Sequence, residues 1–166
     1  METNIEINKP SPKFQDVSIA PMHTAEHILN QTMIRMFGCE RSKTNHIEKK
    51  KSKCDYILSN APTPNEILEI ENRVNEIISQ NLPVKISLVD KKDVPYCVDL
   101  SKLPEDASQI LRLVYVGDYD ICACIGLHVS NTSEIGKFKI ISSDYAEGKF
   151  RIRFKLENCP FIETRQ

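Results

Sequence analysis

The chain has 166 residues, enough for one buried core and too few for two comfortable ones, so we expect a single domain over 1–166. Its 40% apolar and 27% charged content and its formal charge of −1 exclude a global field that would steer an anionic partner. The start of the chain lacks the apolar run of a secretory signal, and no run approaches a membrane span, so we expect a cytoplasmic protein. Six irregularly spaced cysteines favour free thiols or metal ligation over a disulfide framework.

A first helix is predicted over residues 22–37, after a loose, proline-containing segment over 1–20, and Gly38 is expected to end it. Mostly apolar residues recur at three-and-four spacing: Ala25, Ile28, Leu29, Thr32 and Met36. A polar row lines the neighbouring face: His23, His27, Asn30, Gln31 and Ile34. Such a helix would bury one face and present the other as the wall of a cleft.

Two short strands are expected between 43 and 58, around the lysine-rich turn EKKKSK, and a second helix follows. In TPNE, Thr63 is the predicted N-cap, Pro64 takes the first helical position and Glu66 closes a capping box. An apolar face continues to about Asn81: Ile67, Ile70, Val74, Ile77 and Ile78. This helix is expected to be structural.

Alternating apolar and polar residues predict strands in VKISL and in KFRIRFKLE, and ILRLVYV and GKFKII supply two more. Helices and strands are interspersed without a regular βαβ rhythm. We therefore expect an α+β domain with a largely antiparallel sheet and helices packed on one of its faces.

Two pairs of residues with the same spacing indicate a metal site. His23 and His27 lie four apart on the predicted helix, which puts both imidazoles on one side. Cys124 and His128 repeat the spacing and add a thiolate, which favours zinc over magnesium or calcium. An isolated H-x-x-x-H pair is usually two polar residues on a helix face, but the second pair favours metal binding. Cys122 competes with Cys124 but lacks the match to His128.

The stretch HTAEH also fits H-x-x-E-H, the inverted zinc-protease signature, in which Glu26 would be the general base. Three features argue against a protease: the chain is small, those sites take a downstream glutamate as third ligand, and the pair Cys124 and His128 would have no role. Glu26 is therefore expected to be a solvated carboxylate or one that supports the ligands.

Three motifs in this order resemble the editing domain of alanyl-tRNA synthetases, its relative in threonyl-tRNA synthetases and the free-standing AlaX proteins. They are HTAEHIL at 23–29, CIGLH at 124–128, and TSEIG at 132–136 with Phe138 and Ile140. The resemblance covers about residues 20–157 and implies an α+β fold of the synthetase editing-domain type. The usual synthetase pattern is Cys-Gly-Gly-Thr-His, from which this chain departs at Ile125, Gly126 and Leu127.

The resemblance implies a zinc-dependent trans-editing hydrolase, an aminoacyl-tRNA deacylase that removes serine or glycine from mischarged tRNA(Ala). It implies Zn²⁺ ligands at His23, His27, Cys124 and His128. It also implies that Thr44 lies at the amino-acid pocket. Further pocket candidates are Asn30 and Gln31 on the helix face, and His46, which shares a strand face with Thr44.

Several alternatives stay open. Four protein ligands normally mark a closed structural zinc site, so either His128 yields to water or substrate, or the metal positions the substrate's amino group. The same reaction on Ser-tRNA(Thr) and a non-catalytic, zinc-stabilised module that binds RNA or protein are the other candidate functions. The sequence does not predict the oligomeric state.

An RNA partner requires cations for its phosphates. One row of basic side chains alternates along the last predicted strand, at Lys149, Arg151, Arg153 and Lys155, with Lys137 and Lys139 on GKFKI. A second group lies in the lysine-rich turn, at Lys49, Lys50, Lys51 and Lys53. Either group could contact tRNA, although charge runs are usually only solvated faces.

Overall fold

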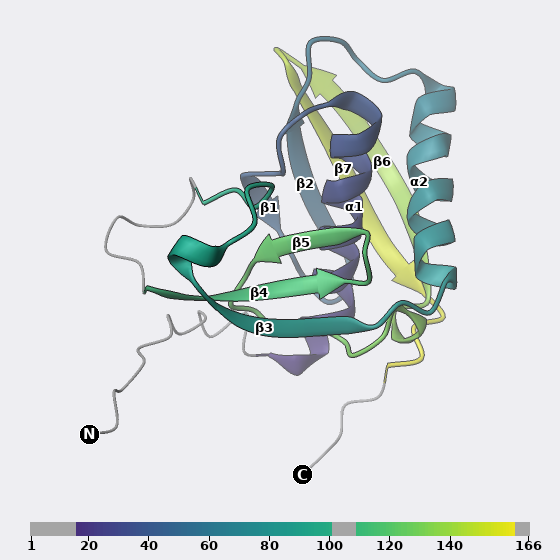
Figure 1. The fold of residues 1–166 in the computed structure, drawn as a ribbon. Helices are drawn as coiled ribbons and strands as arrows, with labels where there is room; N and C mark the ends of the chain where they lie inside the picture. Colours follow the sequence, from purple (N-terminus) through teal and green to yellow (C-terminus); the bar gives the residue numbers. More distant parts are fainter. Residues whose placement is uncertain (1–15, 101–108, 162–166) are drawn as a thin grey trace, which may run out of the picture.

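The computed structural model describes residues 16–100 and 109–161 (Figure 1). Its elements in chain order are η2 (Val17–Ile19), α1 (Ala20–Phe37), β1 (Thr44–His46), β2 (Ser52–Ile57), α2 (Pro64–Ser79), β3 (Val84–Asp90), η3 (Lys91–Asp93), β4 (Ile110–Val116), β5 (Asp120–Ala123), η4 (Thr132–Glu134), β6 (Lys137–Ala146) and β7 (Lys149–Glu157). Most of the N-terminal segment expected to be loose, residues 1–15, lies outside the described part of the chain. None of the helices in the described part combines the length and the apolar character that a bilayer crossing requires.

The strands form two sheets, and every strand pair is antiparallel. One sheet has the order β1-β2-β7-β6 and the other the order β3-β4-β5. The α+β class with helices packed on antiparallel strands is thus confirmed. The expectation of one sheet was incomplete, because β5, which the sequence analysis did not assign as a strand, pairs with β4 and completes a separate three-stranded sheet.

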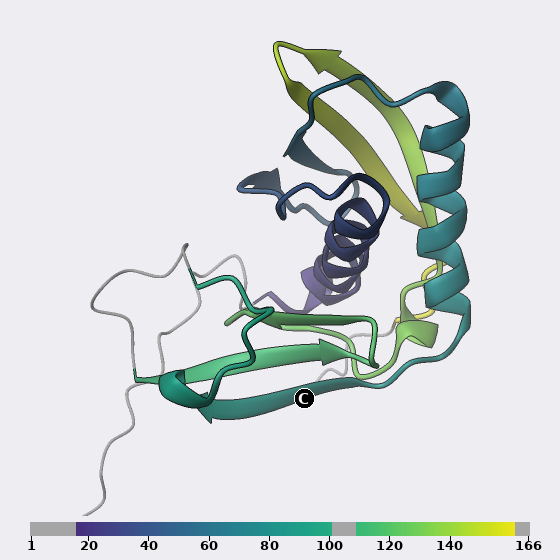
Figure 2. The same ribbon diagram turned by 45° about the horizontal axis from the view of Figure 1, so that its top comes forward.

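Helix α1 lies between the two sheets, and α2 packs beside it against the four-stranded sheet (Figures 1 and 2). Gly38 ends α1 in the left-handed conformation at φ 66°, and its N–H donates to the carbonyl of Ile34 at 2.8 Å. Ala25, Ile28 and Leu29 are fully buried. Because both sheets cover α1, part of its polar row is buried as well: His23, His27 and Asn30 are buried, whereas Gln31 and Ile34 are half-buried.

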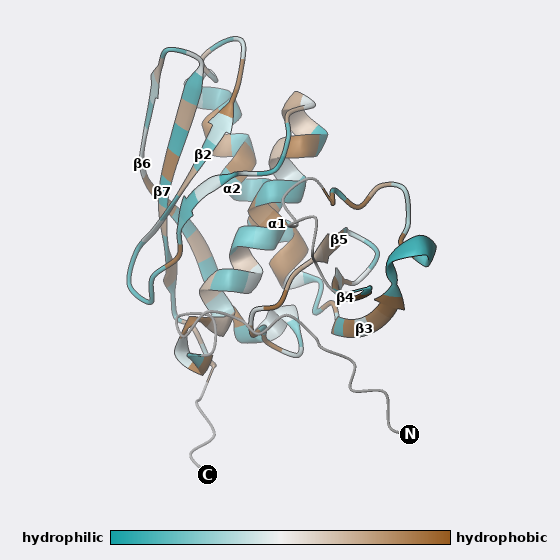
Figure 3. Ribbon diagram, turned by 90° about the vertical axis from the view of Figure 1, so that its left-hand side faces the viewer, coloured by the Kyte–Doolittle hydropathy of each residue, from teal (hydrophilic) through white to brown (hydrophobic). Residues whose placement is uncertain are grey.

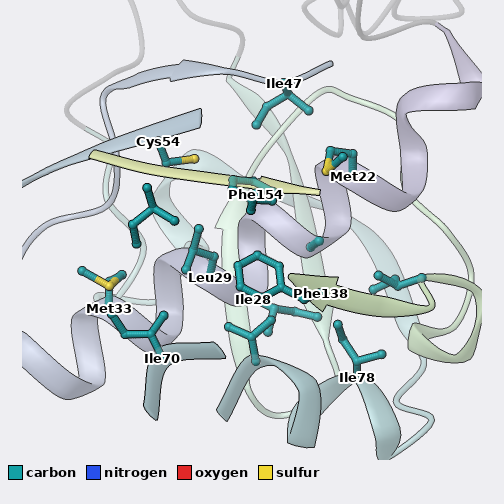
Figure 4. Close-up of a cluster of buried hydrophobic side chains, with 14 of the residues drawn as sticks. Met22, Ile28, Leu29, Met33, Ile47, Cys54, Ile70, Ile78, Phe138 and Phe154 are labelled. Atoms are coloured by element: carbon teal, nitrogen blue, oxygen red, sulfur yellow. The ribbon is translucent and has the colours of Figure 1, made fainter. Parts of the chain in front are cut away.

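The second helix begins as predicted. Thr63 accepts a hydrogen bond from the backbone N–H of Glu66, and the Glu66 carboxylate accepts one from the N–H of Thr63, which forms a capping box. Ile70, Val74 and Ile78 on α2 are buried. They pack into the same core as α1 and the four-stranded sheet, where Ile28, Leu29, Phe138 and Phe154 also lie (Figure 4).

Strand β7 shows the alternation that the sequence predicts (Figure 3). Phe150, Ile152 and Phe154 are buried against the helices, and the basic residues between them point to the outer face of the sheet. Two of these cations have carboxylate partners on neighbouring strands: Arg151 with Asp55, and Arg153 with Asp144. The outer face of the four-stranded sheet is therefore basic but partly neutralised.

Strand β3 is present, but its alternation does not produce a buried face. Ile86 is 50% exposed and Leu88 is 53% exposed. The physical reason is distance from the helix, because α1 packs against β5 and β3 lies at the opposite edge of the three-stranded sheet. The pattern VKISL thus identifies the strand but not its burial.

The Asp55–Arg151 pair predicts how stability depends on pH. Arg151 Nε donates to Asp55 Oδ1 at 2.7 Å and Nη2 donates to Oδ2 at 3.0 Å, and these bonds lower the pKa of Asp55 below its usual value of 3.8. The pair's contribution to stability is therefore complete above about pH 4 and is lost as pH falls through the lowered pKa. In urea titrations, Asp55→Asn should reduce the free energy of unfolding at pH 7 and much less at pH 2, where the carboxyl group is largely protonated in the unfolded chain and titrates in the folded one.

The matched control is Asp144→Asn, because the Asp144 carboxylate is 56% exposed in its pair with Arg153 and should matter less. An equal loss for Asp55→Asn at both pH values would show that the change acts through packing and not through the ion pair.

Candidate metal centre

The structure brings His23, His27, Cys124 and His128 together, and one donor atom from each lies within 4.8 Å of the others. The first two residues occupy successive turns of α1, and the other two follow β5 in the chain. Because α1 packs against β5, two segments about 100 residues apart in sequence meet at this point. The cluster could hold a metal ion.

His23 directs its Nε2 atom to the centre of the cluster. Its Nδ1 lies 3.2 Å from the carbonyl oxygen of Leu127, and its Nε2 lies 3.4 Å from Cys124 Sγ. A carbonyl can only accept, so Nδ1 carries the proton and Nε2 keeps a lone pair. Gly126 contacts the imidazole so closely that a Cβ there would overlap the ring, which explains a glycine between the two later donors.

Thr24 sets the tautomer of His128. Its hydroxyl donates to the carbonyl of Ala20 at 2.9 Å, which uses its only proton, and accepts from the backbone N–H of Val129 at 3.2 Å. His128 Nδ1 lies 2.9 Å from the same oxygen and must therefore donate to it. The Nε2 atom of His128 is then deprotonated, and it is buried without a hydrogen-bond partner among the described residues.

His27 lies between two carboxylates. Its Nε2 is 3.7 Å from Glu26 Oε2, on the side of the cluster, and its Nδ1 is 3.7 Å from Asp120 Oδ2. Arg41 holds Asp120 through contacts of 2.6 and 3.0 Å, and Gln31 Nε2 donates to it at 2.9 Å. The 3.7 Å separation from Asp120 is too long for a hydrogen bond, and His27 Nδ1 is buried without a hydrogen-bond partner among the described residues.

Burial decides the charge state of the cluster. Removal from water lowers the pKa of His23 and holds the pKa values of His27 and His128 well below their usual range, and the histidines also disfavour each other's charge. Burial raises the pKa of Cys124 to about 11. At neutral pH the imidazoles are therefore neutral and ready to ligate, whereas the thiol is protonated and must lose its proton to a metal.

The donor set fits a zinc-type metal. Three imidazole nitrogens and one sulfur converge, a combination that suits zinc and its tetrahedral substitute cobalt and that suits magnesium and calcium poorly. The buried Nε2 of His128 lacks a hydrogen-bond partner in the described structure, and a metal ion would satisfy it. Cys122, the competing thiol in the sequence, lies outside this set of four.

The four pocket candidates occupy different environments. Asn30 is buried and accepts from Tyr56 Oη at 2.6 Å, while Gln31 holds Asp120. Thr44 and His46 are exposed, and they lie on the outer face of the four-stranded sheet, which also carries the cations of β7. The structure therefore brings Asn30 to the cluster and leaves Thr44 and His46 away from it.

Sequence reasoning missed the residues that surround the donors. The residue of β1 that turns inward is Asn45, whose Nδ2 donates to Glu26 Oε1 at 2.8 Å. Thr24, Arg41 and Asp120 were also not singled out. The alternation of β1 could have identified Asn45, since Thr44 and His46 on either side share the opposite face.

One cavity adjoins the cluster, and a second shares part of its lining. A small one of about 150 Å³ is lined by His23, His27, Cys124, Glu26 and Asn30, among others. A larger one of about 430 Å³ runs along β5 and the second half of α1. They share Arg41, Asp99, Cys122 and Ala123 as lining residues. Thr44 lines a third cavity of about 330 Å³, which also includes Arg41.

Sequence comparisons relate the chain to aminoacyl-tRNA synthetases. The family described as "Threonyl and Alanyl tRNA synthetase second additional domain" matches residues 111–153, a range that includes Cys124 and His128. The chain is 35% identical to an alanine–tRNA ligase of Shouchella clausii over 76% of its length, and 34% identical to that of Bacillus subtilis over 85%. These alignments cover 14% and 16% of the two ligases, so the chain corresponds to only a small part of these relatives.

These sequence matches make the chain a relative of the alanyl-tRNA synthetases over the aligned region. More particularly, it is consistent with an AlaX-like editing domain, the family that its motifs resemble.

Metal binding should release a proton from Cys124. Adding one equivalent of Co²⁺ to the metal-free protein near pH 7.5 should give thiolate-to-cobalt absorption and displace about one proton per metal, measurable by titration calorimetry in two buffers of different ionisation enthalpy. Cys124→Ser should abolish the absorption, and Cys122→Ser should retain it. If Cys122→Ser lost the absorption and Cys124→Ser kept it, the sulfur ligand would be Cys122 and the assignment to Cys124 would be wrong.

Thr24→Val should weaken metal binding by about 10- to 100-fold, because His128 would lose the acceptor that orients its ring. Thr32→Val is a matched control: Thr32 is also fully buried on α1 and donates to the carbonyl four residues before it, at 2.8 Å. Competition with a chelator would measure both affinities. Equal metal affinity in the two variants would contradict an orienting role for Thr24.

Proposed function

We propose that this chain is a zinc-dependent aminoacyl-tRNA deacylase that hydrolyses the ester of mischarged tRNA, with Ser-tRNA(Ala) or Gly-tRNA(Ala) as its substrate. The observation that carries this proposal is the convergence of four nitrogen and sulfur donors beside a cavity of about 150 Å³ that adjoins a larger one. The relatives that the chain matches are named alanine–tRNA ligases, which supports the alanine system.

His23, His27, Cys124 and His128 would hold the metal. When bound, zinc would supply Lewis-acid polarisation of an ester carbonyl or an acidified water, which is the chemistry that ester hydrolysis requires. The chain's own groups would do the rest. Thr24 would orient His128, the carbonyl of Leu127 would orient His23, and burial of His23 and His27 would limit their contact with bulk water.

The size of the inner cavity favours a small amino acid. Serine and glycine differ from alanine by one hydroxyl or one methyl group, so discrimination needs a close-fitting, polar wall. Asn30 and Glu26 provide polar atoms on the lining. The larger cavity along β5 has room for the terminal nucleoside of the tRNA.

The basic outer face of the four-stranded sheet is a second part of this proposal. Lys139 and Lys155 are directly paired across β6 and β7, and Lys53 lies opposite Arg153. This face lies on the other side of the sheet from α1 and the donor cluster. Lys43, Lys149 and Arg41 line the third cavity, which shares Glu40 and Arg41 as lining residues with the larger cavity along β5, and this cavity is the proposed place for the acceptor strand.

One observation favours a non-catalytic function. The donor set is complete with four protein ligands, as in closed structural zinc sites. In that case the metal would join α1 to the segment after β5, and the domain would act as a binding module for RNA or protein.

Deacylation of a tRNA panel separates these functions. The metal-loaded protein should release serine or glycine from tRNA(Ala) roughly 10²-fold faster than alanine, and faster than serine from tRNA(Thr). Cys124→Ser should be inactive, and Cys159→Ser, which changes an exposed thiol, should keep full activity. A folded, metal-loaded protein that hydrolyses none of these esters would contradict the deacylase proposal and favour the binding module.

A further inference from the structure

Glu26 is a buried carboxylate that the four-donor cluster does not use. It lies on α1 between the two helix histidines, and it is only 5% exposed. Burial of a carboxylate is costly unless hydrogen-bond donors or cations compensate it. The contacts of its two oxygens therefore indicate what it is for.

One oxygen of Glu26 is fully engaged. Asn30 Nδ2 donates to Oε1 at 3.0 Å, and Asn45 Nδ2 donates to the same atom at 2.8 Å. Asn30 is itself held, because its Oδ1 accepts from Tyr56 Oη at 2.6 Å. These bonds fix the carboxylate plane and leave Oε2 directed away from the asparagines.

The other oxygen faces the cluster. Oε2 lies 4.0 Å from His23 Nε2 and 3.7 Å from His27 Nε2, both beyond hydrogen-bond distance. At these distances neither imidazole nitrogen donates a hydrogen bond to Oε2. Within the described part of the chain, this oxygen thus has no donor at hydrogen-bond distance.

Among the described residues that line the cavity beside Oε2, Arg41 is the one lysine or arginine. Arg41 forms a two-point ion pair with Asp120, whose side chain is fully buried, so its charge is already committed. A ligand group that fills this cavity next to Glu26 must therefore bring N–H donors or a positive charge of its own.

We propose that Glu26 Oε2 receives the α-amino group of the aminoacyl ester, an inference that rests on the deacylase function proposed above. An amino acid linked through its carboxyl group has a primary amine as its one cationic, N–H-rich group, which matches this acceptor. The amine at Glu26 places the ester beside the donor cluster. The same contact selects a free amine, so substrates with a blocked amine, such as peptidyl-tRNA, are rejected.

The test uses two non-hydrolysable probes, 3′-seryl-amino-3′-deoxyadenosine and its N-acetyl derivative, whose binding to the zinc-loaded protein is measured by calorimetry. The unmodified protein should bind the free-amine probe about tenfold or more tightly than the acetylated one, as expected of a hydrogen bond to a charged group. Glu26→Gln, which keeps an acceptor for the two asparagines, should reduce this preference to less than twofold at unchanged zinc content. Glu69→Gln on the exposed face of α2 makes the same chemical change far from the cavity and should keep the preference.

Three results would overturn the inference. The first is equal binding of both probes by the unmodified protein, and the second is a preference for the free amine that survives Glu26→Gln. The third is a Glu26→Gln variant that loses zinc and binds both probes more weakly to the same extent. The second result would assign the amine to the metal, and the third would make Glu26 a support of the metal site. Deacylation of Ser-tRNA(Ala) without a preference for the free amine would refute this inference alone. Absence of both hydrolysis and probe binding would refute the deacylase function with it.

Discussion

The position of α1 between two sheets is the constraint on which the rest of the structure depends. A surface helix leaves its polar side in water, but most of α1 is covered, including His23, Glu26 and His27. Each of these polar groups then needs a partner inside the protein. The apolar side of α1 packs with α2 and β7 in the main core. Its polar side needs buried hydrogen-bond partners, and β5 and the segment after it supply some of them.

The need of these buried polar groups for hydrogen-bond partners explains why the surroundings of the cluster form a connected polar network. Three polar residues of α1 each form a hydrogen bond with a different residue in or near the cluster. Thr24 binds His128, Asn30 binds Glu26 and Gln31 binds Asp120. Tyr56 from β2 and Arg41 from the segment after α1 extend the network. A single change in such a network leaves a buried group unpaired, which is why its members act together.

The sequence predicted this architecture unevenly, for physical reasons. Helix limits and the donors were recognisable because local rules govern them: Gly38 and Thr63 mark helix ends, and a spacing of four residues places His23 and His27 on one side. Whether a face is buried depends on what packs against it, so the exposure of Ile86 and the burial of Glu26 were not predictable locally. Thr44 and Asn45 show why the pocket residue of β1 was not predicted. Neighbouring residues of a strand point to opposite faces of the sheet, so an error of one position exchanges a side chain that faces the cluster for one that faces solvent.

The separation of the donors along the chain has a consequence for folding. His23 and Cys124 are 101 residues apart, so no local segment can assemble the cluster, and the chain must close a long loop before all four donors meet. A metal ion bound there would act as a reversible cross-link between the first helix and the three-stranded sheet, comparable to a disulfide across a loop of that length. Loss of such an ion would remove this cross-link between α1 and the segment after β5, whereas the hydrophobic core around α2 and β7 contains none of the four donors.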